Sequence, residues 1–349
     1  MARLVKILAV DGGGARGLVP SLILQAIERR AAELAGRPRR IHELFDVVAG
    51  ASTGAVVTLL LTKPEPLDCA ALVRLYEEDA KVFFRRSPLR AMFTLNGWVS
   101  PKYSSRNPAT LMRRYIGEKA ELKDALTNIV IPIYALKRKW PRTVLFTRDW
   151  AQRREAEGFN FRMWQVACAA TAAPTYFPTF RLESVGGKKR VYEAVDGAVY
   201  LNNPATEGVA HAMQLLREGR LPPLGSPHTH NAPKSGAEEI TRFLVVSVGT
   251  GYHDVPVSSH SAAHWGRLGW AVPVLDVMFE AQAESASLQL EQVMQEHHYF
   301  RLQPVLGRDL KLDDTSPEAT AYLRHTTERF LAENEAKIAE IGKLLASQA

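Results

Sequence analysis

The stretch Leu4-Val5-Lys6-Ile7-Leu8-Ala9-Val10 runs directly into Asp11-Gly12-Gly13-Gly14-Ala15-Arg16-Gly17, and this junction decides the fold. The first segment is short, β-branched and almost wholly apolar, which is typical of a strand buried on both faces of a parallel sheet. Apolar residues then recur at helical spacing from Leu18, and Gly36 with Pro38 ends that helix. The order is therefore strand, glycine-rich turn and helix.

A second unit of the same kind follows at once. Residues 44–49 read as another buried strand, Gly50-Ala51-Ser52-Thr53-Gly54 as a tight turn, and residues 55–62 as an apolar helix that Pro64 closes. Two consecutive strand–helix units predict an α/β fold with a parallel sheet. Further strands are predicted at 128–135, 143–146, 191–195 and 243–248, and helices near 69–83, 108–116, 162–171, 205–218, 275–297 and 317–346.

Composition places the chain among ordinary globular proteins, with 349 residues, 46% hydrophobic and 23% charged. The 44 basic and 37 acidic residues leave a net charge of +7, and the basic residues are scattered, which argues against a nucleic-acid polymer as partner. A diffuse positive surface is compatible with an anionic membrane surface. Cys69 and Cys168 lie far apart and form neither a disulfide framework nor a zinc motif.

Membrane insertion is not predicted, because no apolar run approaches the ~20 residues that span a bilayer. A strand-like segment begins by Leu4, which leaves no room for a signal peptide, so we expect a cytoplasmic protein, peripheral at a membrane. The proline-rich stretch 219–238 reads as a surface loop, and the buried strand after it belongs to the same sheet. We therefore expect one domain over 1–349, with a core at about 4–251 and a mostly helical extension at 252–349.

The pentapeptide Gly50-x-Ser52-x-Gly54 carries the first catalytic candidate. Its position between a buried strand and an apolar helix is the context of a nucleophile elbow, in which a sharp turn exposes the serine hydroxyl at the sheet edge. The alternative is a helix-capping serine between two convenient glycines.

The first glycine turn, Gly12 to Gly17, also matches the dinucleotide pattern GxGxxG. That site needs an acidic residue at the end of the second strand, where this chain has Ser52. A phosphate-cradling turn between antiparallel strands is a further alternative, but the segment after Gly17 has helical periodicity. The turn more plausibly serves the serine: the amides of Gly12, Gly13 and Gly14 would hold an oxyanion. Arg16 would place a cation at the mouth of the site or hold the glycine turn in position. The alternative is an arginine on the surface without a role in the site.

A serine nucleophile needs a base, and two arrangements compete. A Ser–Asp–His order would use one of the downstream histidines, but none of them has a distinctive strand-end position; these are His211, His253, His264, His297 and His298. Asp196 follows the strand-like segment 191–195 and begins the turn Asp196-Gly197-Ala198. A Ser52–Asp196 dyad at one sheet edge is the simpler interpretation.

With these three motifs in place, the chain resembles the patatin-like phospholipase family, which combines a DGGGxRG turn, a GxSxG nucleophile and a DG[AG] aspartate. The likeness continues, in family order, through residues 101–103, 172–178, 202–204, 247–251 and 265–266. It implies a three-layer α/β fold with a mostly parallel central sheet flanked by helices, and a lipid acyl hydrolase of the phospholipase A or lysophospholipase type.

The resemblance assigns the site as well. It implies Ser52 as nucleophile, Asp196 as base, and Gly12, Gly13 and Gly14 with Arg16 as the oxyanion turn, without a cofactor or metal. The supporting motif positions are Asp11, Gly17, Gly50, Gly54, Gly197 and Ala198. It implies a phospholipid or another acyl lipid as substrate and transient contact with a membrane surface. It leaves open whether the protein forms a homodimer. Plant relatives usually carry a signal sequence, which this chain is expected to lack.

Two other functions stay open at this point. Bacterial members of similar length include defence effectors that cyclic nucleotides activate to degrade membranes, and no motif here separates them from constitutive hydrolases. A catalytically silent binding module on the same scaffold is the second alternative.

Two sets of apolar residues outside the motifs also allow a structural prediction. Segments rich in Gly, Ser and Pro are expected to form an apolar lip for lipid; they hold Phe93, Leu95, Trp98, Trp265, Leu268 and Trp270. A stripe at helical spacing is expected to be packing core rather than a membrane anchor; it comprises Val274, Leu275, Val277, Met278, Ala281, Leu288, Val293 and Met294.

Overall fold

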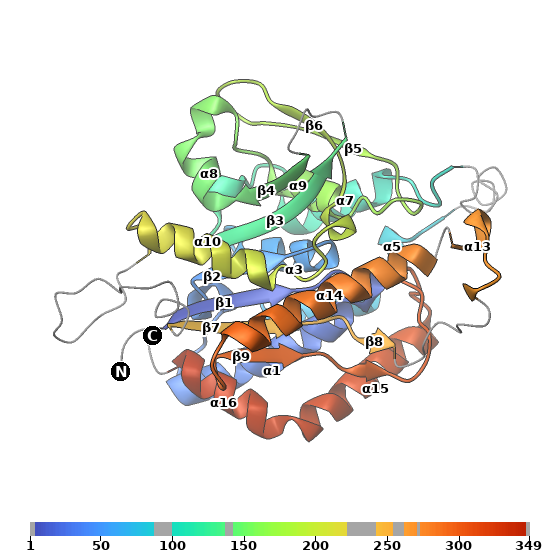
Figure 1. The fold of residues 1–349 in the computed structure, drawn as a ribbon. Helices are drawn as coiled ribbons and strands as arrows, with labels where there is room; N and C mark the ends of the chain where they lie inside the picture. Colours follow the sequence, from blue (N-terminus) through green and yellow to red (C-terminus); the bar gives the residue numbers. More distant parts are fainter. Residues whose placement is uncertain are drawn as a thin grey trace.

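An eight-stranded sheet forms the middle layer of the protein in the computed structural model, which describes residues 4–86, 100–136, 142–221, 242–253, 262–270 and 273–346 (Figure 1). Its strands follow the order β5-β6-β3-β2-β1-β7-β9, and β4 pairs with β3 beside that path. The strands are β1 (Val5–Val10), β2 (Val47–Gly50), β3 (Asn128–Ala135), β4 (Thr143–Thr147), β5 (Phe180–Glu183), β6 (Val191–Asp196), β7 (Phe243–Val248) and β9 (Tyr299–Leu302).

The centre of the sheet is parallel. Strand β1 pairs in parallel with β2 and β7, and the next pairs outward, β2 with β3 and β7 with β9, are parallel as well. Antiparallel pairing begins at one side, where β3 meets β4 and β6, and β6 meets β5. The mostly parallel sheet predicted from the sequence is confirmed.

Both faces of the central strands are buried, which explains their nearly continuous apolar sequence. Leu8 and Val10 of β1 belong to one hydrophobic core, while Ile7 and Ala9 belong to a second core on the opposite face. The first core is covered by α1 (Leu18–Ala35), α3 (Thr53–Thr62), α4 (Cys69–Arg74), α7 (Arg106–Ile116), α9 (Met163–Ala170), α15 (Pro317–Glu333) and α16 (Glu335–Ala346).

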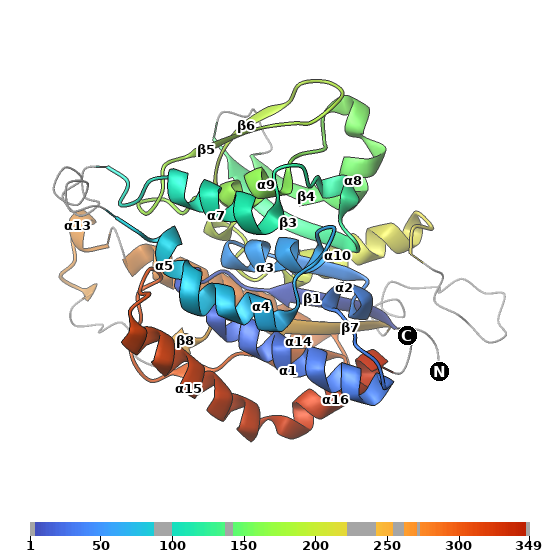
Figure 2. The same ribbon diagram turned by 180° about the vertical axis from the view of Figure 1, so that it is seen from behind.

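The second core is covered by α10 (Ala205–Arg217) and α14 (Pro273–Val293). Figure 1 shows these two helices on the near face, and Figure 2 shows α1, α4 and α15 on the face behind. Helices thus flank the sheet on both sides, as the three-layer prediction requires. Among the described residues, no helix is both long and apolar enough to cross a membrane.

Short elements complete the architecture. The helix predicted over 69–83 is continuous but contains a π-helical turn, η2 (Leu75–Asp79), between α4 and α5 (Ala80–Phe83). The remaining short elements are α2 (Ile41–Leu44), α8 (Arg148–Arg153), α13 (Arg267–Trp270), η1 (Gly14–Gly17), η4 (Leu122–Asp124), η5 (Glu155–Glu157), η6 (Gly197–Val199), and a two-stranded sheet of β8 (Tyr252–His253) and β10 (Val305–Leu306).

Several boundaries differ from the sequence predictions. The predicted strand 44–49 begins only at Val47, because residues 41–44 form α2. The helix predicted over 317–346 breaks at Asn334 into α15 and α16. Strands β5 and β9 were not predicted, and β9 places a strand of the main sheet inside the extension expected to be mostly helical. Most of the predicted loop 219–238 lies outside the described residues.

The interpretation of the α14 stripe as core is wrong. Val274, Val277, Met278, Leu288 and Val293 are 37–54% exposed. The face that α14 buries consists of Phe279, Ala283, Ala286, Ser287 and Leu290. Hydrophobic residues occur on both faces of this helix, so periodicity alone selected the wrong one.

Gly54 provides a test of how closely β1 and α3 approach each other. A Cβ at this position would lie 2.1 Å from the carbonyl oxygen of Val10, whereas a Cβ at Gly266 would meet no atom within 4 Å. Although alanine is the better helix former, we expect Gly54→Ala to lower the free energy of unfolding by about 1–3 kcal/mol because the backbone must shift. Urea unfolding measures this loss. Gly266→Ala is the control, and equal effects in the two variants would contradict the packing argument.

Candidate active site

Ser52 occupies a strained turn between β2 and α3. Its φ is 50°, a left-handed value that side-chain-bearing residues rarely adopt. A Cβ at Gly50 would lie 2.1 Å from the carbonyl oxygen of Gly54, so the small residues on both sides permit the tight reversal. The predicted strand–turn–helix context is therefore present, with Ser52 held in the geometry of a nucleophile elbow.

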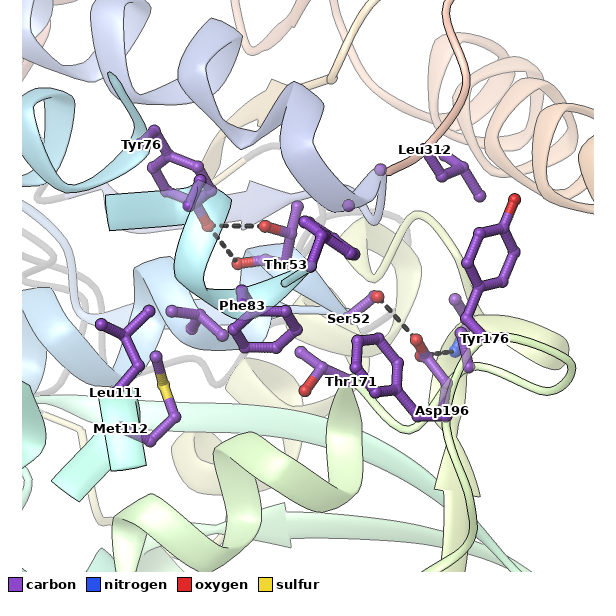
Figure 3. Close-up of a pocket in the computed structure, with 18 of the residues that line it drawn as sticks. Ser52, Thr53, Tyr76, Phe83, Leu111, Met112, Thr171, Tyr176, Asp196 and Leu312 are labelled. Atoms are coloured by element: carbon purple, nitrogen blue, oxygen red, sulfur yellow. Dashed lines mark hydrogen bonds between the residues drawn. The ribbon is translucent and has the colours of Figure 1, made fainter. Parts of the chain in front are cut away.

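Asp196, at the end of β6, lies beside this turn. Ser52 Oγ donates a hydrogen bond of 2.6 Å to Asp196 Oδ2, and the amide of Ala198 donates one of 2.8 Å to Oδ1 (Figure 3). The backbone of Gly197 packs closely on β3, since a Cβ there would lie 2.2 Å from the carbonyl oxygen of Pro132. The turn Asp196–Ala198 thus fixes the position of the Asp196 carboxylate.

The two residues meet for a reason that the sequence did not indicate. Strand β2 is parallel to β3, whereas β6 is antiparallel to β3. Strand direction alone would therefore place the carboxyl ends of β2 and β6 at opposite edges of the sheet. However, β3 pairs with β2 only from Asn128 to Val130 and then extends beyond it. Because β6 pairs with this overhang, with Asp196 opposite Ile133, the carboxylate reaches the end of β2.

Burial controls the acidity of Asp196, which is only 1% exposed. Desolvation raises the pKa of Asp196 to about 7, and the hydrogen bonds from Ser52 and Ala198 offset only part of that rise. A carboxylate with this pKa is a stronger base than an exposed aspartate and is still substantially ionised at neutral pH.

The glycine turn lies on the other side of Ser52. The Gly12 amide donates to the carbonyl oxygen of Asn202, whereas no acceptor occurs among the described residues for the amides of Gly13 and Gly14. Gly13 and Gly14 also line the cavity at Ser52. A Cβ at Gly14, whose φ is +58°, would lie 2.2 Å from the carbonyl oxygen of Leu312, which itself accepts from the Ala15 amide. Gly13 and Gly14 thus line the cavity with amides that have no acceptor among the described residues, whereas the Gly12 amide is already used.

Asp11 anchors the start of this turn through a buried ion pair. Arg301 on β9 contacts both carboxylate oxygens, with Nη1 3.0 Å from Oδ1 and Nη2 2.5 Å from Oδ2, and Nη1 also donates to Ser247 Oγ at 2.8 Å. The Asp11 side chain is 3% exposed and that of Arg301 15%. The guanidinium reaches across β7 to the end of β1, so the C-terminal part of the chain helps to fix the glycine turn.

Arg16 is not a surface residue, since it is only 8% exposed. Its Nη1 lies 3.0 Å from Nε2 of His253, whose Nδ1 lies 3.0 Å from the carbonyl oxygen of Arg308. Arg16 therefore connects η1 to the segment after β7. Gly17 is required nearby, because a Cβ there would lie 2.3 Å from the ring of Tyr76.

A mostly apolar cavity of about 60 Å³ opens at Ser52. Figure 3 shows Asp196 and Tyr176 on one side of the serine and Phe83, Leu111 and Met112 on the other. The full lining includes Gly13, Gly14, Ser52, Thr53, Val56, Leu75, Tyr76, Ala80, Phe83, Phe84, Leu111, Met112, Thr171, Ala173, Tyr176, Phe177, Asp196, Ala198, Asn202, Phe279 and Leu312. No histidine occurs among these described lining residues, which favours the dyad over a Ser–Asp–His arrangement.

Sequence reasoning missed several residues that build this site. Asn202 lies in a segment noted only for its resemblance, yet its carbonyl holds Gly12 and its side-chain amide donates to the carbonyl oxygen of Phe279 at 3.0 Å. Arg301 and Leu312 had no motif around them. Their contacts span about three hundred residues of sequence, so only tertiary structure could reveal them.

The predicted apolar lip is described only in part. Phe93, Leu95, Trp98 and the side chain of Leu268 lie outside the described residues. Trp265 is half-buried and Trp270 is 36% exposed, and their rings meet edge to face with centroids 5.2 Å apart. Trp270 is the last residue of α13, which stands next to the amino end of α14 (Figure 1).

Comparison with known proteins assigns the family of this three-layer α/β protein, in which a serine is hydrogen-bonded to a buried aspartate. The family model described as patatin-like phospholipase matches residues 8–209. The chain belongs to the patatin-like phospholipase family.

Its relatives match over most of their length. Patatin-like protein 1 of Arabidopsis thaliana is 32% identical, covering 86% of this chain and 74% of the relative. Patatin-like protein 2 of Oryza sativa subsp. indica is 29% identical, covering 96% and 86%. Among solved structures, VipD from Legionella pneumophila is similar at a TM-score of 0.35 and 13% identity, covering 95% of this chain and 67% of that one.

The raised pKa of Asp196 predicts how stability depends on pH. An unfolded aspartate titrates near 3.9, whereas the folded value is about 7, so folding favours the protonated form. This contribution to stability is complete below about pH 4 and is lost as the pH rises through 7. Relative to Asp196→Asn, the wild-type protein should therefore lose about 2–3 kcal/mol of unfolding free energy between pH 5 and pH 8.

Urea unfolding of both proteins at the two pH values measures this difference. Asp124→Asn, at an exposed position, should show no comparable change relative to wild type. A pH-independent difference between wild type and Asp196→Asn would show that Asp196 does not titrate in this range.

Proposed function

We propose that this protein is a lipid acyl hydrolase that cleaves fatty-acyl esters of membrane lipids, of the phospholipase A or lysophospholipase type. Membership in the patatin-like phospholipase family supports hydrolysis of acyl lipids. The observation that carries the mechanism is the hydrogen bond of 2.6 Å from Ser52 Oγ to the buried Asp196 carboxylate at the mouth of an apolar cavity.

In the first step, Asp196 accepts the Ser52 proton while Oγ attacks the ester carbonyl carbon. The negative charge moves to the carbonyl oxygen, where the free amides of Gly13 and Gly14 are the donors that this structure favours. The bond to the leaving alcohol then breaks, and the alcohol takes the proton from Asp196. The fatty acyl group remains on Ser52.

In the second step, a water molecule gives a proton to Asp196 and attacks the acyl carbon. The bond to Ser52 breaks, Oγ recovers the proton, and the fatty acid leaves. The raised pKa of Asp196 suits both steps, because the same group must accept and return a proton near neutral pH. The apolar side of the cavity, with Phe83, Leu111 and Met112, would receive the acyl chain.

The surroundings of the site are part of the same proposal. Residues 1–349 act as one domain, because the glycine turn is held by Arg301 and Leu312 of the extension. The protein would work in the cytoplasm and touch membranes transiently. A Ser–Asp pair with its own cavity supports an active enzyme rather than a silent binding module.

Two substitutions test the dyad. Ser52→Ala removes the nucleophile and Asp196→Asn removes the base, so each should lower kcat by at least about 10³-fold while the fold persists. The first assay is labelling of Ser52 by a fluorophosphonate probe with peptide mapping. A panel of phospholipid, lysophospholipid and acylglycerol substrates then measures turnover.

Asp124→Asn, at an exposed position on another element, is the matched control and should retain wild-type turnover. Full activity in either dyad variant would refute the mechanism. Absence of labelling in the wild-type protein would indicate a binding module, and labelling only after addition of a cyclic nucleotide would indicate a gated effector.

A further inference from the structure

Helix α14 presents its apolar side outward. Val274, Val277, Met278 and Leu288 are 37–50% exposed, and with the exposed Ala281 they follow helical spacing along one line. Figure 1 shows α14 crossing the near face of the molecule with none of the described elements in front of it. We call this line of five residues the outer stripe. Its exposure is unusual, because a surface helix normally turns such a stripe toward the core.

The inner side of α14 buries apolar residues and also makes polar contacts beside the site. The side-chain amide of Asn202 donates to the carbonyl oxygen of Phe279 at 3.0 Å, and the backbone amide of Asn202 donates to Gln282 Oε1 at 3.1 Å. Gln282 Nε2 donates to the carbonyl oxygen of Val199 at 3.2 Å. The helix is thus fixed to the loop that follows Asp196, and the outer stripe contributes nothing to that attachment.

Acidic residues border the outer stripe on one side only. At 100° per residue, Asp276, Glu280, Glu284 and Glu291 all fall on the same flank, and all four are exposed. The helix carries no lysine or arginine. If two copies packed α14 against α14 in antiparallel fashion, these acidic rows would face each other and repel. The charge pattern therefore disfavours an antiparallel α14–α14 dimer through this face, and it also disfavours anionic lipid.

The helix that carries the outer stripe also contributes to the site. Phe279, on the opposite side of the same helix, lines the cavity at Ser52. Helix α13, which ends at Trp270, stands near the amino end of α14 (Figure 1). Trp270 packs on Trp265, and tryptophan is a residue that favours the boundary between water and lipid. A lipid surface that meets the outer stripe would thus lie beside the helix that forms one wall of the cavity.

We propose that the outer stripe of α14 docks on an uncharged, zwitterionic lipid surface, an inference that rests on the proposed lipid acyl hydrolase function. The five apolar residues enter the boundary between headgroups and acyl chains, and the acidic flank stays in water. Docking places α14, whose inner side carries Phe279 of the cavity wall, directly against the lipid surface that supplies the acyl chain. The net charge of +7 is not the source of this contact, because the residues at the contact are apolar and acidic.

The test uses the full-length protein and vesicles of ether-linked phosphatidylcholine, which contain no ester bond to cleave. The variant Val277→Gln with Met278→Gln should lower the vesicle partition coefficient about tenfold, because two inserted apolar side chains are lost. Its hydrolysis of a soluble short-chain ester should equal that of the wild-type protein. Its hydrolysis of ester-linked phosphatidylcholine vesicles should fall in parallel with binding.

Leu34→Gln with Leu126→Gln is the matched control, since both leucines are exposed to a similar extent (47% and 43%) on other elements. The control should bind as the wild-type protein does. Adding phosphatidylglycerol to the vesicles should not enlarge the difference between wild type and the stripe variant. Glu280→Lys with Glu284→Lys should increase binding to such anionic vesicles severalfold.

Two outcomes would overturn the inference. One is equal binding of the stripe variant and the wild-type protein to the ether-linked vesicles. The other is a wild-type dimer that the stripe variant converts to a monomer in light scattering, which would assign the face to a second copy. Failure of the proposed function looks different: the wild-type protein would cleave no ester, while its binding still depended on the outer stripe.

Discussion

The hydrogen bond between Ser52 and Asp196 is the contact on which the arrangement of the site depends, and the length of one strand makes it possible. The two residues are 144 positions apart in the chain. Strand β3 extends beyond β2, and β6 pairs antiparallel with the overhang, which returns Asp196 to the end of β2. A shorter β3 would leave the carboxylate without a strand to align it. The length and register of β3 thus determine that Ser52 and Asp196 meet at the sheet edge.

The C-terminal third of the chain completes the site although the family model ends at residue 209. Arg301 holds Asp11 from β9, Leu312 accepts the hydrogen bond of Ala15, and Phe279 of α14 forms part of the cavity wall. The contacts of Arg301 and Leu312 fix the glycine turn. A buried ion pair such as Asp11–Arg301 is costly to desolvate, so its value here lies in orientation more than in net stability.

Prediction from sequence succeeded where the information was local. The elements β1, α1 and α3 were predicted because apolar periodicity and glycine turns are encoded in neighbouring residues. It failed for α14, where apolar residues occur on both faces, and for β9, a strand of only four residues. Sequence-based prediction also gave the amides of Gly12, Gly13 and Gly14 to the oxyanion site. The Gly12 amide instead donates to the carbonyl oxygen of Asn202, which lies 190 residues away. Such competition for a donor is visible only when both partners are placed.

The sequence by itself determined the α/β class, the serine on its strand–helix turn, the glycine turn and the identity of the aspartate, because each is written in a short run of residues with its own backbone preference. The tertiary structure decided which groups meet. It paired Ser52 with Asp196, gave the amides of Gly13 and Gly14 no acceptor within the described part of the chain, and turned the apolar stripe of α14 outward. It also raised the pKa of Asp196, because burial is a property of the packed chain and no local sequence specifies it.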